Sequence, residues 1–391
     1  MSPPDAPPPL LLVSQFFPPA VGGSAVLFEN VYSRLGRDVH VLTDPRSSPG
    51  PAGPQGAFRI HHAPLATPHW GLLHPAGLIH HARTAARIRR AAPSGAAVHC
   101  ARVLPEGVAA WMARKTGGPR YVCWSHGEDL ATASLSRDQK LTTQLVLRGA
   151  DASLANSRNT ADLLRGLGVP EREICVAYPG VDCERFRPDV DGGPVRRRLG
   201  LGPEDPLLLS VGRLQRRKGQ DLVIRAMAEL AAELPRLRYA VVGTGEEETP
   251  LRELAAASGV ADRVVFAGKV DDDDLPSWYA ASDVFVLANR REGAHIEGFG
   301  LVFLEAQAIQ RPVIAGASGG PPEAIADGET GFLVNGTDAS ELAAVIRRLA
   351  GDEALRARMG RAGRERVRTR FTWERAAAAV EELTRRLEAG R

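Results

Sequence analysis

The chain has 391 residues, of which 44% are hydrophobic and 24% are charged, and its formal net charge at pH 7 is +3. This length favours two domains over one, and the composition is typical of a soluble globular protein. The small net charge gives no indication of a nucleic acid partner, and no apolar run is long enough to cross a membrane. The N-terminus also lacks the basic start of a secretion signal, so we expect a cytoplasmic protein.

In the first half of the chain, short apolar runs alternate with amphipathic stretches. This alternation is typical of α/β domains with parallel sheets. The predicted strands are 9–14, 38–43, 96–101, 120–125 and 152–157. The predicted helices include 24–36, 79–92 and 106–116.

A segment rich in Pro, Gly and charged residues, 187–205, is typical of a linker, and the alternation resumes after it. The strands predicted there are 206–212, 238–243, 263–268, 283–288, 312–317 and 331–335. The helices predicted there are 219–234, 249–258, 274–281, 301–310, 321–326 and 338–350.

The whole pattern predicts an α/β protein of two doubly wound, Rossmann-like domains, at 1–190 and 206–371, with a linker at 191–205. A last helix within 372–391 is expected to pack back on the N-terminal domain. Ligands of doubly wound sheets bind beyond the carboxyl ends of the strands, so we expect the site in a cleft between the domains.

The first loop with chemical content reads "FFPPAVGGSAVL" and follows the first strand. Gly22 and Gly23 precede a predicted helix, where backbone N–H groups can approach an anion closely. A plain strand-to-helix turn explains the same pair. Further along, "CWSHGEDL" places His126 at the carboxyl end of a strand, where the side chain would face the predicted cleft.

In the second half, "VGRLQRRKGQDL" follows the first strand and carries Arg213 and Lys218 five residues apart. Arginine can bind two phosphate oxygens at once, and lysine supplies a compact mobile charge, so the pair suits a diphosphate. The chain has only four lysines against 45 arginines, which makes a lysine at this place informative. A solvated basic loop is the alternative.

Two further motifs argue against other chemistries. The segment "VVGTGEEE" has Glu248 where a dinucleotide fingerprint requires glycine, which speaks against an NAD site. The run Asp271–Asp274 could hold a metal ion, or it could cap the helix that begins near Leu275. Adjacent carboxylates on one short run cannot all converge on one ion, so we expect no metal.

The stretch "EGFGLVFLE" carries two carboxylates, Glu297 in a loop and Glu305 on a largely apolar helix. A buried carboxylate needs hydrogen-bond donors, and the vicinal hydroxyls of a ribose suit Glu305. Glu297 can reach another part of the same ligand. Between the two glutamates, the helix N-terminus offers backbone N–H groups that have no partner within the helix. A structural pairing of Glu305 with an arginine is the alternative.

These motifs together resemble the family 4 retaining glycosyltransferases of GT-B fold. The ordered segments that carry the resemblance include "PPAVGGSAVLFENVYSRL", "SHGEDL", "YPGVDCERFRP", "SVGRLQRRKGQDL", "VVFAGKV", "EGFGLVFLEAQA" and "PVIAGASGGPPEAIADGETGFLV". Glu297 and Glu305, the two glutamates of "EGFGLVFLE", match those of the family's E-x7-E signature. The resemblance covers nearly the whole chain.

The resemblance implies a role for each candidate residue. The donor diphosphate would be bound by Arg213, Lys218 and the N–H groups of Gly23, Leu301 and Val302, with Gly22 beside them. Glu305 would bind the ribose hydroxyls. The donor sugar would be bound by Glu297, the N–H groups of Phe299 and Gly300, and His126. Lys269 and Val270 would lie at the nucleobase.

The implied reaction is transfer of a hexosyl group from a nucleotide-sugar to an acceptor hydroxyl, by attack on the face that the leaving group occupied. The family implies no cofactor and no metal. The segment "ANRREGAHIEGFG", which leads up to and includes Glu297, resembles that of the family branch that uses GDP-mannose and phosphatidylinositol mannosides. This resemblance favours GDP-mannose as the donor. A UDP-sugar donor, a UDP-sugar 2-epimerase and a non-catalytic homologue are the alternatives.

The acceptor would be lipid-linked, a glycan or a small molecule. The basic helix 80–92 could contact an anionic membrane or acceptor, which would make the protein peripheral to the inner face of the membrane. A solvated helix face is the other interpretation of this segment.

Overall fold

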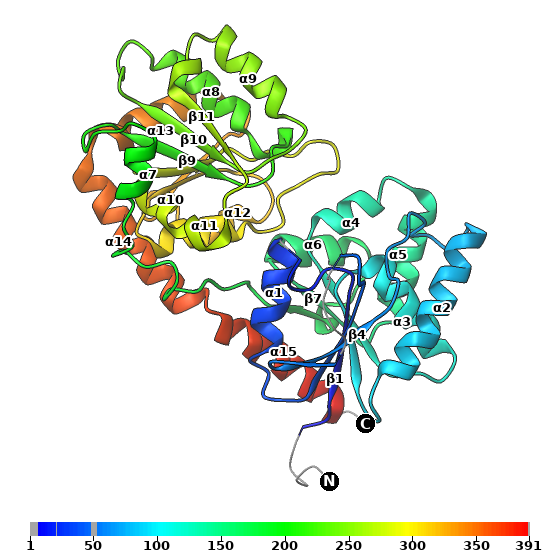
Figure 1. Cartoon of the computed structure of the whole chain (residues 1–391). Helices are drawn as coiled ribbons and strands as arrows, with labels where there is room; N and C mark the ends of the chain where they lie inside the picture. The colour runs from blue at the N-terminus through cyan, green and yellow to red at the C-terminus, as the bar shows by residue number, and fades with distance from the viewer. Residues whose placement is uncertain (1–6, 21, 48–52, 390–391) are drawn as a thin grey trace. The chain divides into compact units, whose positions relative to one another are not determined.

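A computed structural model describes residues 7–20, 22–47 and 53–389 (Figure 1). The chain divides into two compact units, one of Met1–Pro179 with Trp373–Arg391 and one of Gly180–Thr372. Residues 1 and 391, where the predicted domains begin and end, lie outside the described part. Within that part, no helix is both long and apolar enough to cross a bilayer.

Eight described strands form the sheet of the first unit, in the order β3-β4-β2-β1-β5-β6-β7-β8. Their bounds are β1 (Leu10–Ser14), β2 (Val39–Thr43), β3 (Gly53–Gln55), β4 (Phe58–His62), β5 (Ala97–Cys100), β6 (Tyr121–Ser125), β7 (Ala152–Ala155) and β8 (Ile174–Val176). All pairings are parallel except that of β3 with β4. Strands β1 and β6 are buried along their whole length, as expected for central strands of a parallel sheet.

The helices of the first unit connect these strands and cover the sheet. They are α1 (Gly23–Tyr32), α2 (Pro75–Ala91), the π-helical turn η1 (Val103–Gly107), α3 (Val108–Lys115), α4 (Glu128–Ala133), α5 (Arg137–Gly149), α6 (Arg158–Gly166), the 3₁₀ turn η2 (Glu171–Glu173) and α15 (Trp373–Ala389). The sequence pattern did not indicate α4, α5, α6, β3, β4 or β8.

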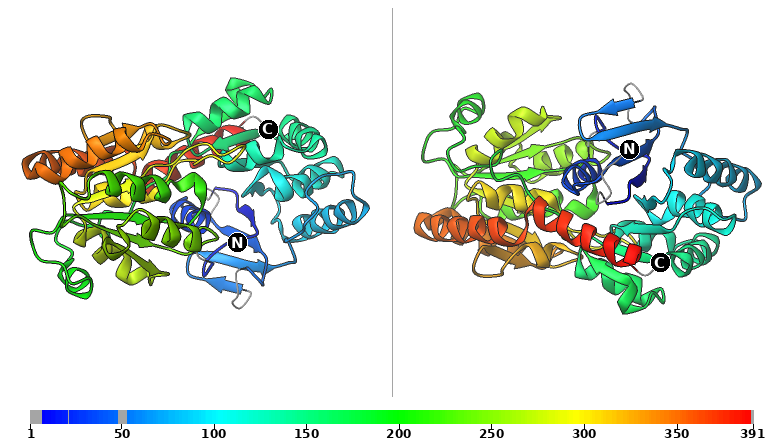
Figure 2. Two further views of the ribbon diagram at one scale, coloured as in Figure 1. Left: turned by 90° about the horizontal axis from the view of Figure 1, so that it is seen from above. Right: turned by 90° about the horizontal axis from the view of Figure 1, so that it is seen from below.

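The last helix, α15, belongs to the first unit although it comes at the end of the chain (Figure 2). It packs on α1 and β8. The fully buried guanidinium of Arg37 holds it through Glu381 at 2.6 Å and Glu388 at 2.9 Å. Because both carboxylates neutralise and hydrogen-bond this cation, the buried charge is paired as it must be.

In the second unit, six described strands form one sheet in the order β11-β10-β9-β12-β13-β14. Their bounds are β9 (Leu207–Val211), β10 (Arg238–Val242), β11 (Val264–Gly268), β12 (Val284–Leu287), β13 (Val313–Gly316) and β14 (Gly331–Val334). Every pairing is parallel. The strand order reverses between β9 and β12, and ligands of doubly wound sheets bind at such a switch point.

The described helices of the second unit agree with the predicted ones apart from their ends, two additional α-helices and three short 3₁₀ turns. They are α7 (Gly193–Arg198), η3 (Arg216–Lys218), α8 (Gln220–Glu229), α9 (Glu248–Ala257), η4 (Ala261–Arg263), η5 (Asp272–Asp274), α10 (Leu275–Ala281), α11 (Leu301–Ala308), α12 (Pro321–Ala324), α13 (Ala339–Gly351) and α14 (Glu353–Arg370). The additional α-helices are α14 and α7, and α7 lies inside the segment expected to be a linker.

The segment 191–205 folds as part of the second unit because one arginine ties it there. The guanidinium of Arg196 donates to the carbonyl oxygen of Ala281 at 2.9 Å and lies 3.4 Å from the carboxylate of Asp283. It also donates to the carbonyl oxygens of Gly202 and Asp205. Proline, glycine and charge in this segment therefore build a packed turn and helix.

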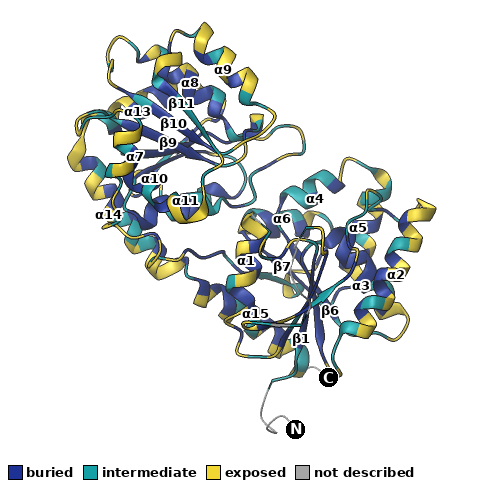
Figure 3. Cartoon of the chain, viewed as in Figure 1, coloured by how far each residue is buried: buried dark blue, intermediate teal, exposed yellow. Residues whose placement is uncertain are grey.

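Each unit has its own core. In the first unit, buried side chains of the sheet strands pack against η1, α3, α5 and α6. In the second, those of β9, β10 and β12 pack against α8, α9, α13 and α14. Figure 3 shows this division, with buried residues along the strands and exposed residues on the outward faces of the helices.

Candidate functional site

The predicted site residues of the second unit come from loops that follow β9, β11 and β12. All strands of this sheet are parallel, so the carboxyl ends of these three strands lie at one edge. Lys218 is in the loop after β9, Lys269 directly follows β11, and Glu297 is in the loop after β12. The topology therefore gathers them at the edge where doubly wound sheets bind ligands.

The loop after β9 contains the short 3₁₀ turn η3, which ends at Lys218 and is followed by Gly219. This glycine has a φ of 75°, and a Cβ there would lie 2.0 Å from the carbonyl oxygen of Ala288 at the end of β12. Only glycine permits both the left-handed backbone and this close approach. Gly219 thus presses the loop that carries Lys218 against the end of β12.

Glu297 lies in a cluster of charges. Its Oε2 accepts from the ammonium Nζ of Lys218 at 2.5 Å and from Nη1 of Arg217 at 3.0 Å. The side chains of Glu297, Lys218 and Arg217 are only 12%, 11% and 7% exposed. Burial raises the pKa of the Glu297 carboxyl, but the charges of Lys218 and then Arg217 outweigh it and hold this pKa below its ordinary value.

The N-terminus of α11 follows Glu297 closely. Gly300 precedes the helix in the left-handed region, with a φ of 88°. Phe303 uses its N–H to bond the carbonyl oxygen of Gly300 at 3.1 Å. The N–H groups of Leu301 and Val302, in the first turn, have no partner available within the helix, and half-buried residues at such a turn can bind an anion.

Glu305 is one turn into α11 and pairs with a tyrosine, not with the arginine weighed as the alternative. Tyr279 of α10 donates its hydroxyl to Oε2 of Glu305 at 2.6 Å. Burial raises the pKa of the Glu305 carboxyl, and the Tyr279 hydrogen bond only partly offsets the rise. No residue in the described part of the chain bonds the second carboxylate oxygen, which leaves Oε1 able to accept hydrogen bonds from a ligand.

Glycines hold the backbone around this site through close contacts. A Cβ at Gly319 would lie 2.2 Å from the carbonyl oxygen of Glu297, and one at Gly320 would lie 2.0 Å from that of Gly298. In the loops after β10 and β9, a Cβ at Gly243 would lie 2.0 Å from the carbonyl oxygen of Gly212. The glycines of "VVGTGEEE" and "SGGPP" therefore serve backbone packing around the loops of the site.

The remaining candidates of the second unit are more open. Arg213 and Lys269 are exposed, and Val270 is half-buried. The acidic run Asp271–Asp274 is exposed, and the side chain of Asp274 makes no capping hydrogen bond to α10. Side-chain capping therefore does not explain this run. Within the described ranges, no three His, Cys, Asp or Glu side chains gather as a metal ion would need.

In the first unit, Gly22 and Gly23 stand at the start of α1, as predicted. Gly22 has a φ of 149°, no side chain caps the helix, and both glycines are exposed. His126 directly follows β6, and its Nε2–H donates to the carbonyl oxygen of Ala101 at 2.9 Å, since a carbonyl can only accept. When the ring is neutral, Nδ1 is then its acceptor nitrogen.

Aromatic residues fix the ring of His126. It stacks on Trp124 with an interplanar angle of 4° and meets Phe28 edge-on. Trp124 donates to the Tyr32 hydroxyl at 2.9 Å, and that hydroxyl lies 2.8 Å from Nδ1 of His99. Burial lowers the pKa of His99 to about 3, so this imidazole is neutral and accepts from Tyr32.

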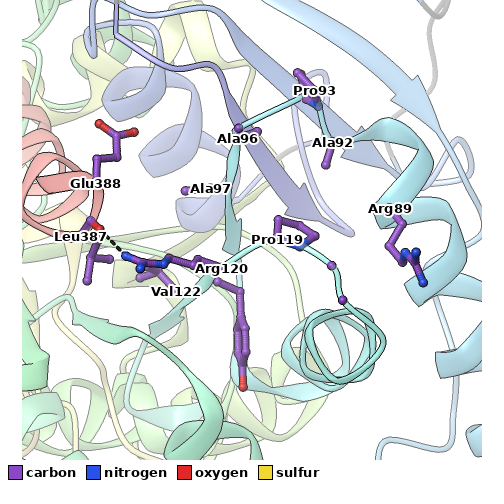
Figure 4. A pocket seen from close by; sticks show the side chains of 14 residues that line it. Arg89, Ala92, Pro93, Ala96, Ala97, Pro119, Arg120, Val122, Leu387 and Glu388 are labelled. Atoms are coloured by element: carbon purple, nitrogen blue, oxygen red, sulfur yellow. Dashed lines mark hydrogen bonds between the residues drawn. The ribbon is translucent and has the colours of Figure 1, made fainter. Parts of the chain in front are cut away.

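A cavity of about 450 Å³ opens in the first unit, away from its candidate residues (Figure 4). It lies at the amino ends of β5 and β6, lined by residues such as Ala97, Tyr121 and Glu388. Arg120 crosses it and donates to the carbonyl oxygen of Leu387 in α15. His126 lies at the opposite end of β6, so this cavity is separate from the predicted site.

Sequence reasoning missed two residues of the charged site. Arg217 stands in the basic run "RRK" beside Lys218, yet it is buried and bonded to Glu297. Tyr279 stands within the predicted helix 274–281, and its hydroxyl binds Glu305. Neither contact leaves a local signal, since about 80 residues separate Arg217 from Glu297 and 26 separate Tyr279 from Glu305.

Comparison with known proteins agrees with the resemblance. Residues 21–185 match the model of glycosyltransferase family 4, and residues 194–366 match that of glycosyl transferases group 1. The chain is 33% identical over 395 residues to the GDP-mannose-dependent alpha-(1-6)-phosphatidylinositol monomannoside mannosyltransferase of Mycobacterium tuberculosis, covering 98% of this chain and 99% of that enzyme. The enzyme of the same name from Mycolicibacterium smegmatis is 37% identical over 277 residues, or 70% of this chain and 72% of that one.

A solved structure extends the likeness to the fold. Sucrose-phosphate synthase from Thermosynechococcus elongatus superposes with a TM-score of 0.79 at 25% identity, over 98% of this chain and 100% of that one. Two doubly wound sheets, two matching family models and a relative aligned along nearly the whole chain agree with one another. The chain therefore belongs to the family 4 glycosyltransferases, has their GT-B fold, and is a hexosyltransferase related to the phosphatidylinositol mannoside mannosyltransferases.

Proposed function

We propose that this hexosyltransferase moves a mannosyl group from GDP-mannose to an acceptor hydroxyl and retains the anomeric configuration. The observation that carries the proposal is the cluster around Glu297 at the carboxyl edge of the sheet. Lys218 and Arg217 both bond one carboxylate oxygen of Glu297, among side chains that are at most 12% exposed. A lysine ammonium held here, next to the loop that leads into the N-terminus of α11, suits the diphosphate of a nucleotide-sugar.

A nucleoside diphosphate sugar suits this edge of the sheet in each of its parts. The diphosphate would accept from Lys218, Arg213 and the N–H groups of Leu301 and Val302. The ribose hydroxyls would donate to the open oxygen of Glu305, whose other oxygen is held by Tyr279. The sugar would bind Glu297 with the N–H groups of Phe299 and Gly300, and the base would lie by Lys269 and Val270.

The proposed chemistry requires the protein mainly to stabilise a leaving group. The bond between the anomeric carbon and the diphosphate oxygen breaks, and negative charge builds on the diphosphate. Lys218, Arg213 and the start of α11 would stabilise that charge. The acceptor hydroxyl attacks the carbon from the same face, and its proton passes to the departing phosphate. No separate protein base and no metal ion are required in this scheme.

GDP-mannose is proposed as the donor because the relatives that align along most of this chain are named as GDP-mannose-dependent enzymes. The basic segment that precedes Glu297, which resembles that of the GDP-mannose-using branch of the family, supports the same assignment. In the structure, Arg290 of this segment forms two bonds to the carboxylate of Asp221, at 2.9 and 3.2 Å. The roles that the resemblance implies for Gly22, Gly23 and His126 in the first unit stay predictions.

For the acceptor we propose a hydroxyl of a phosphatidylinositol-linked mannoside, because the same relatives are named as phosphatidylinositol monomannoside mannosyltransferases. Exposed apolar side chains support a lipid-linked acceptor. In α5, Leu141 and Leu145 are 64% and 40% exposed on one face, with Arg137 and Arg148 in the same stripe. A basic, apolar helix face is suited to the surface of an anionic membrane.

The experiment is mannosyl transfer from GDP-mannose to a phosphatidylinositol monomannoside in vesicles, with the anomeric configuration of the product read by NMR. The wild-type protein should form an α-linked product, and Lys218→Ala should lose nearly all turnover with an unchanged melting temperature. Arg216→Gln is the matched control, because Arg216 is 67% exposed and its ion pair, among the described residues, is with Glu292 at 3.4 Å. Near-wild-type turnover in Lys218→Ala, or a β-linked product, would contradict the proposal.

A further inference from the structure

Two cations bind the same oxygen of Glu297, and this arrangement allows each cation a different role. Nζ of Lys218 and Nη1 of Arg217 both bond Oε2, at 2.5 and 3.0 Å. In the described part of the chain, no residue bonds the other oxygen, Oε1, and that oxygen is not among the fully buried atoms. Oε1 is therefore open to a hydroxyl of the donor sugar while Oε2 is occupied.

Lys218 cannot be the sole cation that neutralises Glu297 and also bind the donor diphosphate fully. An ammonium is a single point charge with three N–H donors, and a diphosphate would attract it away from the carboxylate. Nζ lies beside Gly212, 3.9 Å from where a Cβ would stand, so no side chain at this position lies against the ammonium. A buried carboxylate whose only cation is drawn away would tend to take up a proton and lose its acceptor strength.

Arg217 supplies the second cation. Its side chain is only 7% exposed, and a guanidinium stays charged at every pH that a protein tolerates. Its carbonyl oxygen accepts from the N–H of Arg290 at 2.9 Å, which ties η3 to the loop that carries Glu297. The neighbouring Arg216 is 67% exposed, so the burial belongs to Arg217 and is not a property of the whole basic run.

We propose that Arg217 is a positioning residue that keeps Glu297 ionised and held by Oε2, so that Lys218 is available to the donor diphosphate and Oε1 to the donor sugar. This inference rests on the proposed function and adds a residue to it. The charged and titratable side chains on the elements next to Glu297, besides Arg217 and Lys218, include Arg213, Arg216, Asp221, Arg290, Arg291, Glu292, His295 and Glu323. Of these, Arg290 pairs with Asp221 and Arg216 with Glu292.

The test compares Arg217→Gln, Arg217→Lys and the exposed control Arg216→Gln in mannosyl transfer from GDP-mannose across pH 5 to 9. Arg217→Gln should lower kcat/KM by about 10- to 150-fold, the range of a hydrogen bond to a charged group, and should move the acidic limb of the profile to higher pH. Arg217→Lys should restore the limb toward its wild-type position. Arg216→Gln should leave both unchanged.

A double-mutant cycle with Glu297→Gln separates positioning from general damage. If Arg217 acts through Glu297, then Arg217→Gln should change kcat/KM by less than twofold in the Glu297→Gln background. An equal loss in both backgrounds, or a pH profile of Arg217→Gln that coincides with the wild-type profile, would overturn the inference.

A readout without ligand keeps the inference distinct from the proposed donor. In the free protein, acid unfolding followed by circular dichroism should begin at higher pH in Arg217→Gln than in the wild type, since Glu297 then has one cation fewer. If the wild type fails to use GDP-mannose, the donor assignment is wrong while this measurement still decides the role of Arg217. Coincident acid transitions of wild type, Arg217→Gln and Arg217→Lys would contradict that role.

Discussion

Replacing Glu305 by glutamine removes the charge of a buried carboxylate and nearly preserves its shape. The Tyr279 hydroxyl, 2.6 Å from Oε2, can still donate to the amide oxygen of the new side chain. What is lost is the anionic oxygen Oε1, which we propose accepts from the ribose hydroxyls. A hydrogen bond to a charged group contributes about 1.5–3 kcal/mol, so the affinity for GDP should fall by about 10- to 150-fold.

The stability of the free protein should change in the opposite direction. Burial raises the pKa of Glu305, so the folded state binds its proton more tightly than the unfolded state does. As pH rises from the ordinary glutamate pKa through this raised pKa, ionised Glu305 reduces the free energy of unfolding. Glu305→Gln removes that loss, and its melting temperature at pH 8 should equal or exceed that of the wild type.

Calorimetric titration with GDP and with UDP measures the first effect, since both nucleotides carry the same ribose. The matched control is Glu329→Gln, the same change at an exposed position of the second unit, which should leave the affinity unchanged. In the wild type, GDP affinity should also decrease as pH falls, because the protonated carboxyl accepts less strongly. An affinity of Glu305→Gln within twofold of the wild-type value would refute the assignment of the ribose to this residue.

Three other predictions address the same edge of the sheet. Because Lys218 and Arg217 lower the pKa of Glu297, its ionisation stabilises the fold above pH about 4.3, and this contribution is lost as pH falls further. Glu297→Gln should therefore flatten the acid side of a plot of melting temperature against pH. Gly300→Ala should destabilise the protein by about 1–3 kcal/mol in urea unfolding, since its Cβ would lie 2.6 Å from the Phe303 ring at a φ of 88°. Transfer from GDP-mannose should continue at an unchanged rate after dialysis against EDTA, and a loss restored by Mg²⁺ would contradict the metal-free scheme.

The architecture could be predicted because parallel strands leave strong local signals. Each predicted strand of the second half overlaps an observed strand that is one or two residues shorter, as 283–288 does with β12. The helix α14 was missed because polar residues surround it almost completely, which weakens its amphipathic pattern. The segment 191–205 was misjudged because Arg196 anchors it through a contact to Asp283, about 87 residues away.

The candidate site shows the same limit. Glu297, Lys218 and Glu305 could be identified from the sequence because each lies in a recognisable local motif. Sequence could not reveal which neighbours they bind, since the contacts of Arg217 and Tyr279 depend on how loops from separate strands pack. The glycine pair Gly319–Gly320 did carry a signal in "SGGPP", but its physical reason, close contact with the backbone of Glu297 and Gly298, appears only in three dimensions.

The central claim is that the charged cluster at the carboxyl edge of the second sheet binds a nucleotide-sugar, with GDP-mannose preferred. A thermal-shift screen of GDP-mannose, UDP-glucose, UDP-GlcNAc and ADP-glucose, without added metal, tests it most directly because stabilisation follows affinity for the folded state. The wild type should be stabilised most by GDP-mannose, and Lys218→Ala should lose most of that shift. Stabilisation by a UDP-sugar alone would contradict the donor assignment, and an equal shift in Lys218→Ala would contradict the site.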